Sequence, residues 1–316
     1  MEQRTGRFFK SNIWKGVQAL FGLILIYLVF TIMSSSFRSF DTLKTILTQA
    51  VIMGTLAAGP TIVLISGGLD LSIGSLFCLV AVVTGRMLVA GFPVAIVVIL
   101  AFGVGALCGA FNGGLIVGTG IPAFIGTLGM MKAYRGVAEI LGMNQDMSRF
   151  PVSFQMIGSG YLIPISIMAV TYFLVYVFLS RTKIGFNCYA IGGNNEVARL
   201  AGVPVKKYYI IYYTLGGVAA AISALILVSR LNFTNSAFGV GFELNAIAAV
   251  IIGGTSLSGG VGGIGRTLIG VLIVTTLNAG LSHMGVSSSW QQISIGFVII
   301  LAVWLDFAQR RSEAKV

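Results

Sequence analysis

The chain has 316 residues, of which 56% are hydrophobic and only 9% are charged, whereas an average soluble domain has roughly 25% charged residues. Its mean hydropathy is +0.96, which excludes an ordinary soluble globule and indicates a multi-spanning membrane protein. The formal net charge of +11 does not indicate nucleic-acid binding, because the basic residues stand in short clusters between apolar runs.

Ten hydrophobic segments follow one another along the chain, on the measure that a bilayer core of about 30 Å needs about 20 apolar residues per helix. The first follows a basic N-terminal stretch and is too long for the apolar core of a signal peptide, so we expect an uncleaved span. The eighth is too short to cross alone, which predicts half of a broken or re-entrant element. The segments are approximately 16–34, 45–65, 71–90, 93–117, 121–141, 161–180, 208–230, 244–254, 264–283 and 289–307.

The distribution of Lys and Arg predicts that both termini face the cytoplasm. In this orientation, thirteen of the twenty Lys and Arg residues lie on the inner side and five on the outer side. Residues 1–316 are therefore expected to form one all-α transmembrane domain. It would have six spans in 16–180, an inner polar loop in 181–207 and four further segments in 208–307.

A polar, glycine-rich break follows the second segment. Irregular backbone at membrane depth is tolerated only where protein or a water-filled cavity satisfies its polar groups. We expect Asp70 to cap the next helix with help from Ser72. Contact with a solute is the alternative, because an ionisable residue between two apolar segments is a candidate functional residue. The residues of this break are Ser66, Gly67, Gly68, Asp70 and Ser72.

The fourth and fifth segments carry patterns of packing and charge. Gly105, Gly109 and Gly113 recur at four-residue spacing, which predicts close contact between helix backbones. Lys132, Arg135 and Glu139 share one face of the fifth segment. We expect them to form an ion-paired cluster, with contact to a solute as the alternative.

The inner loop contains a short stretch with helix signals at both ends. Asn194 or Asn195 can cap its start, and Gly202 can end it. Its apolar residues Val197, Leu200 and Ala201 have the spacing of one helix face. A short capped helix along the inner surface suits docking to a cytoplasmic partner.

A second polar break follows the eighth segment and comprises Gly253, Gly254, Thr255, Ser256 and Ser258. Residues 253–260 align with residues 67–74 of the first break, and five of the eight positions are identical. Duplicated halves are a known route to membrane transport folds.

Several chemistries are excluded by what the sequence lacks. Residues 260–265 formally match G-x-G-x-x-G, but the flanks are membrane-like and no acidic residue follows at the distance that a dinucleotide site needs. No P-loop occurs, so any ATP that drives transport must be hydrolysed by another subunit. His283 is the only histidine and the three cysteines are far apart, so we expect no catalytic residue, metal site or cofactor.

Four stretches resemble the ribose/monosaccharide-type permeases of ABC transporters, a family that also includes branched-chain amino acid permeases. They occur in the family's order, and the resemblance covers nearly the whole chain. They are LISGGLDLSIG at 64–74, IPAFIGTLG at 121–129, YAIGGN at 189–194 and AIAAVIIGGTSLSGG at 246–260.

This resemblance implies the permease subunit of a bacterial ABC importer in the inner membrane, which carries a monosaccharide or sugar-like solute. The implied partners are a second permease subunit, two cytoplasmic ATP-binding subunits, a periplasmic sugar-binding protein and membrane lipid, with no nucleic acid. An ion-gradient-driven secondary transporter is the alternative. It would be expected to bury a coupling acid, for which Asp70 is the lone candidate.

The resemblance also implies roles for residues. It makes 194–204 the coupling helix that an ATPase groove receives, and Glu196 stands where relatives often have a small residue. The coupling-helix residues are Gly192, Asn194, Glu196, Ala198, Arg199, Gly202 and Pro204. The two breaks are the expected translocation pathway, with Ser66, Gly67, Gly68, Asp70, Ser72, Gly253, Gly254, Thr255, Ser256 and Ser258.

Overall fold

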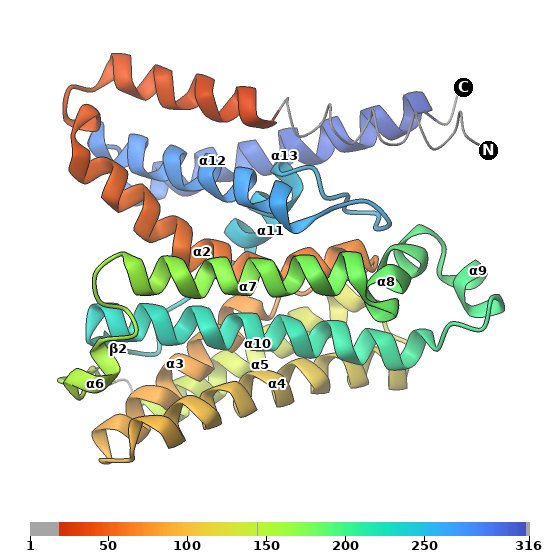
Figure 1. Ribbon diagram of the computed structural model, residues 1–316, viewed down its shortest axis with the longest axis horizontal. Coiled ribbons are helices and arrows are strands. Elements are labelled where there is room, and N and C mark those ends of the chain that lie inside the picture. The colour runs from red at the N-terminus through yellow and green to blue at the C-terminus, as the bar shows by residue number, and fades with distance from the viewer. Residues whose placement is uncertain (1–18, 144, 314–316) are drawn as a thin grey trace.

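A computed structural model of the chain describes residues 19–143 and 145–313, and it is a bundle of helices (Figure 1). Two short strands, β1 (Met147–Ser148) and β2 (Phe233–Thr234), pair antiparallel at one end of the bundle. In chain order the helices are Ala19–Met33, η1 (Ser36–Arg38), α2 (Phe40–Ile65), α3 (Ile73–Val89), α4 (Val94–Thr119), α5 (Ala123–Gly142), α6 (Val152–Gln155), α7 (Leu162–Arg181), α8 (Lys183–Gly193), α9 (Asn195–Leu200), α10 (Val205–Leu231), α11 (Phe242–Ile252), α12 (Ile264–His283) and α13 (Ser288–Glu313).

Each of the ten predicted hydrophobic segments overlaps one of these helices, although residues 16–18 of the first segment lie outside the described residues. Among the described residues, five helices are long and apolar enough to cross a membrane, namely α2, α4, α7, α10 and α12. Helix α11 has only 11 residues, which is too short to cross a bilayer core alone, as the eighth segment predicts. The chain is an all-α polytopic membrane protein.

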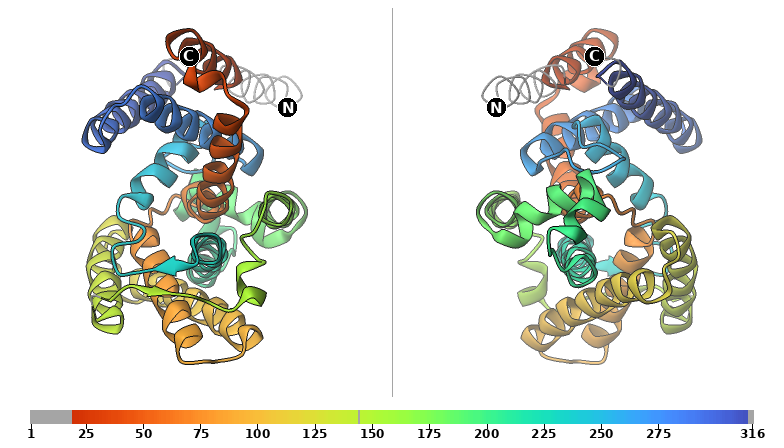
Figure 2. Two further views of the ribbon diagram at one scale, coloured as in Figure 1. Left: turned by 90° about the vertical axis from the view of Figure 1, so that its left-hand side faces the viewer. Right: turned by 90° about the vertical axis from the view of Figure 1, so that its right-hand side faces the viewer.

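The bundle has two distinct ends. At one end, on the left in Figure 1, lie α6 and the β1–β2 pair, and at the other end lie α8 and α9. Helix α10 runs between these ends through the middle of the bundle and packs against α2, α3 and α4 (Figure 2). Helix α2 is central too, because every residue from Ala50 to Ser66 is buried.

Glycines set the distance between α4 and α10, as the G-x-x-x-G spacing predicts. A Cβ on Gly105 would lie 2.5 Å from the carbonyl oxygen of Gly217. A Cβ on Gly109 would lie 2.9 Å from the Cα of Thr214. Both distances are too short for a side chain, so the two backbones touch only because these positions are glycine.

The ion-paired cluster predicted on α5 is wrong. Arg135 donates from Nη1 to the carbonyl oxygens of Ser236 (2.9 Å) and Phe238 (2.7 Å). Lys132 and Glu139 are exposed, and in the described part of the chain neither has a salt-bridge partner. The reason is that exposed ion pairs gain little free energy, whereas the loop before α11 offers Arg135 two backbone acceptors.

Candidate functional site

The two polar breaks, which are far apart in sequence, meet in the fold. The backbone N–H of Gly260 donates to the carbonyl oxygen of Ile65, at the end of α2, over 2.9 Å. The end of α8 lies against both breaks, because a Cβ on Gly192 would collide with the Ile65 carbonyl oxygen and lie 2.5 Å from the Gly260 nitrogen. We call this meeting point of 65–67, 192–193 and 259–260 the glycine junction.

Close backbone contact holds the glycine junction together. A Cβ on Gly259 would lie 2.8 Å from both the carbonyl oxygen of Gly192 and the Cα of Gly67. The φ angles of Gly67 and Gly259 are 79° and 81°, in the left-handed region that favours glycine. Glycine is therefore required here for contact as well as for backbone conformation.

Three tyrosines connect α8 and α10 to the breaks. Tyr209 donates to the carbonyl oxygen of Ser66 over 3.1 Å, and Tyr213 donates to that of Leu69 over 3.0 Å. Tyr189 of α8 donates to the carbonyl oxygen of Gly262 over 3.3 Å. Carbonyl groups that the helix breaks leave free are thus satisfied by side chains of the segments that flank α9. These tyrosines were not predicted from the sequence, although Tyr209 and Tyr213 stand one helical turn apart in an apolar segment.

Asp70 lies in a buried polar network at the start of α3. Its Oδ1 accepts from the Ser72 N–H (2.9 Å) and from the Ser72 hydroxyl (2.6 Å). Asn112 of α4 donates to the Ser72 hydroxyl over 2.7 Å, and Tyr134 of α5 donates to Asn112 Oδ1 over 2.9 Å. Ser72 is the N-cap residue, but its side chain makes no capping bond. Asp70 is 2% exposed, so in this conformation its carboxylate orders the turn before α3 and does not face an open path.

The other polar residues of the breaks are also mostly turned inward. Ser66 donates to the carbonyl oxygen of Val63 over 2.7 Å. Thr255 and Ser256 are buried, whereas Ser258 is exposed.

The glycines of the breaks are close to other parts of the chain or have left-handed backbone angles. Gly253 packs against the backbone of Arg266, and Gly254 has a φ of 91°. Gly68 lies against Tyr213. The breaks are therefore closed to solvent at most of the predicted positions.

Helix α9 is built as the sequence predicts. The Asn194 side chain accepts from the Val197 N–H over 3.0 Å and caps its start. At its end Gly202 has a φ of 81°, and the Val203 N–H donates to the carbonyl oxygen of Ala198 over 3.1 Å, as in a glycine-ended helix. Pro204 then precedes α10.

The two faces of α9 differ in exposure. Ala198 is buried and packs towards Tyr208 and Ile191, whereas Val197 and Leu200 are 60% and 76% exposed. Beside them Arg199 and Glu196 form an ion pair, with 2.6 Å between Nη2 and Oε1. The hydrogen bond from Arg199 and its positive charge lower the pKa of the Glu196 carboxyl. An exposed apolar face beside a charge pair is thus left without a partner among the described residues.

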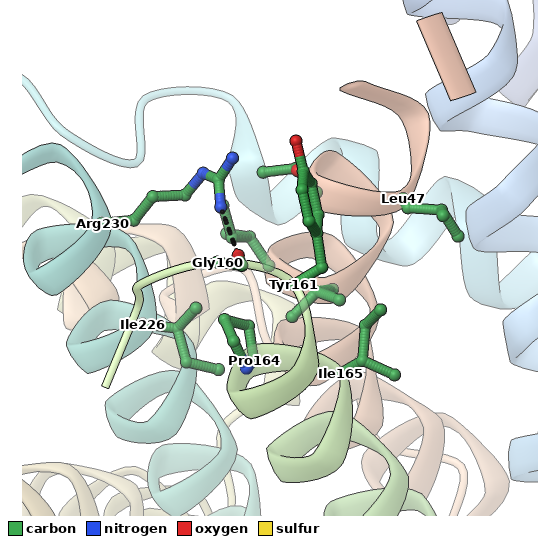
Figure 3. Close-up of a pocket in the computed structure, with 10 residues that line it drawn as sticks. Leu47, Gly160, Tyr161, Pro164, Ile165, Ile226 and Arg230 are labelled. Atoms are coloured by element: carbon green, nitrogen blue, oxygen red, sulfur yellow. Dashed lines mark hydrogen bonds between the residues drawn. The ribbon is translucent and has the colours of Figure 1, made fainter. Parts of the chain in front are cut away.

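Two apolar pockets lie away from these residues. The small pocket in Figure 3 lies between α2, α7 and α10, where Arg230 donates to the carbonyl oxygen of Gly160 over 3.1 Å and lies 5.8 Å from the centre of the Tyr161 ring. A larger cavity of about 400 Å³ lies between Ala19–Met33, α2 and α12. Neither contains a predicted site residue. Within the described residues no group of His, Cys, Asp or Glu is arranged to hold a metal ion.

Comparison with known proteins matches residues 42–303 to the family described as the permease component of the branched-chain amino acid transport system. The ribose import permease protein RbsC of Bacillus subtilis is 38% identical over 97% of each chain. The fructose import permease protein FrcC of Rhizobium meliloti is 36% identical over 90% of this chain and 83% of its own. The galactose/methyl galactoside import permease protein MglC of Salmonella typhimurium is 33% identical over 93% of this chain and 94% of its own. No solved structure matches the chain.

Proposed function

Since the chain belongs to the family of the permease component of branched-chain amino acid transport systems, we propose that it is the permease subunit of a bacterial ABC importer for a monosaccharide. The observation that carries the proposal is its similarity along almost its full length to import permeases for ribose, fructose and galactose. The five apolar helices of spanning length support a place in the inner membrane. The chain does no covalent chemistry of its own.

In this proposal the pore is formed by two permease subunits with about ten membrane segments each and with both termini in the cytoplasm. Two ATP-binding subunits hydrolyse ATP, and a periplasmic sugar-binding protein delivers the solute. The basic residues support this orientation, because Arg181, Lys183 and Arg199 lie at the end of the bundle that holds α8 and α9.

Helix α9 would be the coupling helix. Its exposed Val197 and Leu200 supply the apolar contact that a groove in the ATPase can receive, while Ala198 anchors the helix to the permease. Movement of α9 would reach both breaks, because Gly192 lies only two residues before Asn194, the N-cap of α9, and touches the end of α2 and the second break. ATP-driven shifts of α9 would thereby change the populations of outward-open and inward-open states.

The test is uptake by reconstituted vesicles. The permease is inserted into liposomes with its ATPase inside, its binding protein outside, and labelled D-ribose, D-fructose or D-galactose as the probe. We expect uptake of one of these sugars only when ATP and both partners are present. Uptake by the permease alone, driven by an ion gradient, would overturn the proposal in favour of a secondary transporter.

The assignment of α9 is tested separately. A Leu200→Asp substitution places a charge on the exposed apolar face and should reduce co-purification of the ATPase at least tenfold, at the scale of a lost interface anchor. Lys183→Ala, at the same end of the bundle but outside α9, is the matched control. Unchanged co-purification of the Leu200→Asp variant would contradict the coupling role.

A further inference from the structure

Glu243, which the sequence analysis did not single out, lies between the two broken elements of the fold. It belongs to the first turn of α11, the half-length helix that leads into the second break. Its carboxylate reaches α3, the helix that begins after the first break. A Cβ on Gly74 of α3 would collide with Glu243 Oε2 and would lie 2.7 Å from the carbonyl oxygen of Gly239. The rings of Phe77 and Phe242 pack beside this contact, with 5.3 Å between their centres.

The contact lies well away from the nearer end of the bundle, measured along α3. Gly85, further along α3, packs against Thr234 of the β1–β2 pair, which marks one end of the bundle. The 11 positions between Gly85 and Gly74 correspond to about 16 Å along a helix. This is roughly half of a bilayer core of about 30 Å. An acidic side chain at that depth is costly and is by default a functional residue.

One oxygen of the Glu243 carboxylate accepts no hydrogen bond from the described residues. Oε2 is buried and has no hydrogen-bond partner among the described residues. Arg135 is close enough to attract the carboxylate, but its guanidinium donates hydrogen bonds to the carbonyl oxygens of Ser236 and Phe238. A buried polar atom without a partner calls for an explanation, because such atoms are few in native proteins.

The surroundings of Glu243 differ from those of Asp70. Asp70 also has a buried oxygen, Oδ2, without a hydrogen-bond partner among the described residues, but its side chain is fully enclosed and its Oδ1 is bound to Ser72. Glu243 is only half-buried, and its neighbours Val240 and Leu244 are 70% and 51% exposed. The start of α11 therefore reaches the surface of the subunit, where a path between two permease subunits would run.

We propose that Glu243 is a specificity-determining residue of the solute path, whose carboxylate accepts hydrogen bonds from hydroxyl groups of the sugar when α11 and α3 separate. A neutral polyol offers O–H donors to a carboxylate, which only accepts, and such charge-assisted bonds are stronger than neutral ones. The same charge repels anionic solutes. The inference rests on the proposed importer function.

A structural role is the alternative outcome. The backbone N–H groups of Gly241 and Glu243 also act on the carboxylate, and a negative charge stabilises a helix N-terminus. A structural role would change folding and assembly. A solute contact would change sugar transfer while ATP hydrolysis continues.

The first experiment measures sugar uptake and ATP hydrolysis in the same vesicles, with the binding protein saturated by its sugar. We expect Glu243→Gln to lower uptake about tenfold, which is the scale of a charge-assisted hydrogen bond replaced by a neutral one, while ATP hydrolysis stays within about twofold. Asp41→Asn, which alters an exposed acid at the start of α2, should leave both rates unchanged. Wild-type uptake in the Glu243→Gln variant would overturn the inference. So would a parallel loss of uptake, ATP hydrolysis and thermal stability.

A second experiment uses the wild-type permease and does not depend on transport. A hydrophobic carbodiimide is added with and without D-ribose, D-fructose or D-galactose, and modification of Glu243 is read by mass spectrometry. Protection by one of the sugars supports the inference even if the vesicles show no ATP-dependent uptake, in which case only the importer function fails. The inference is overturned if none of the sugars reduces the modification of Glu243, or if Glu243 is not modified in any sample.

Discussion

The backbone N–H of Gly260 donates a hydrogen bond to the carbonyl oxygen of Ile65 over 2.9 Å. This bond joins two breaks that are almost 200 residues apart in the sequence, at a carbonyl that the end of α2 leaves without an intrahelical partner. Gly192 packs on both groups. The geometry of one break is therefore set together with that of the other and with the segment before α9.

The first prediction concerns Gly192. Gly192→Ala places a Cβ against the Ile65 carbonyl oxygen, which is backbone and cannot move aside like the end of a flexible side chain. We expect a loss of about 1–3 kcal/mol in the free energy of unfolding, together with slower sugar uptake. Thermal unfolding in detergent and uptake by vesicles measure the two effects. The matched control is Gly193→Ala, because a Cβ there meets nothing within 4 Å. Equal behaviour of the two variants would show that the glycine junction is not tightly packed.

The second prediction concerns the hydroxyl group of Tyr213. Tyr213→Phe removes the 3.0 Å bond to the carbonyl oxygen of Leu69, and we expect a loss of about 1 kcal/mol in the free energy of unfolding. Tyr172→Phe is the control, since the buried Tyr172 hydroxyl has no partner among the described residues. Removal of that group should be neutral or stabilising. Thermal unfolding of both variants, side by side, decides whether the tyrosine bonds hold the first break.

The third prediction separates the capping and solute roles of Asp70. Asp70→Asn keeps a side-chain oxygen that accepts from the Ser72 N–H, so we expect a folded protein with partial transport. Asp70→Leu leaves buried donors of Ser72 without an acceptor, at a cost of about 1–3 kcal/mol for each group. Thermal unfolding should therefore rank the Leu variant clearly below the Asn variant. Full stability and activity of Asp70→Leu would show that neither role matters.

The fourth prediction concerns the packing of α4 on α10. Gly109→Ala brings a Cβ into contact with the backbone of Tyr213 and Thr214, and we expect α4 to be pushed away at a cost of about 1–3 kcal/mol. Gly114→Ala on the same helix meets nothing within 4 Å. It should be neutral or should stabilise the helix by up to about 1 kcal/mol. The unfolding temperature of the Gly109→Ala variant should fall and that of the Gly114→Ala variant should not, and a loss of stability in both would contradict the close-packed interface.

The fifth prediction concerns pH and the ion pair of α9. Arg199 lowers the pKa of the Glu196 carboxyl, so any contribution of the pair is present above the usual pKa of glutamate and is lost as the pH falls through the lowered value. Binding of the ATPase through α9 should therefore not change between about pH 6 and 8 on account of Glu196. Co-purification at several pH values, with Glu196→Gln as the comparison, measures this. A difference between the wild-type and Gln profiles that arises only near neutral pH would contradict the assignment.

The sequence by itself determined the class of the fold, the positions of the hydrophobic segments and the short capped helix α9. These features depend on local composition and spacing: long apolar runs, an asparagine before the helix and a glycine after it. It also identified both breaks, because glycine, serine and aspartate interrupt an apolar run visibly. The spacing of Gly105, Gly109 and Gly113 likewise predicted a packing surface, although not which helix it contacts.

Only the tertiary structure decided which distant groups meet. No local pattern shows that Gly192 touches both breaks or that the Glu243 carboxylate occupies the space beside Gly74. Nor does any local pattern show that Arg135 donates to the loop before α11 and forms no ion pair with Glu139. These contacts join segments separated by tens to hundreds of residues, and they form because helix packing places particular glycines opposite particular backbone and side-chain atoms. Asp70 shows the same limit, since its neighbours in sequence made it a candidate for the solute path and its neighbours in space enclose it.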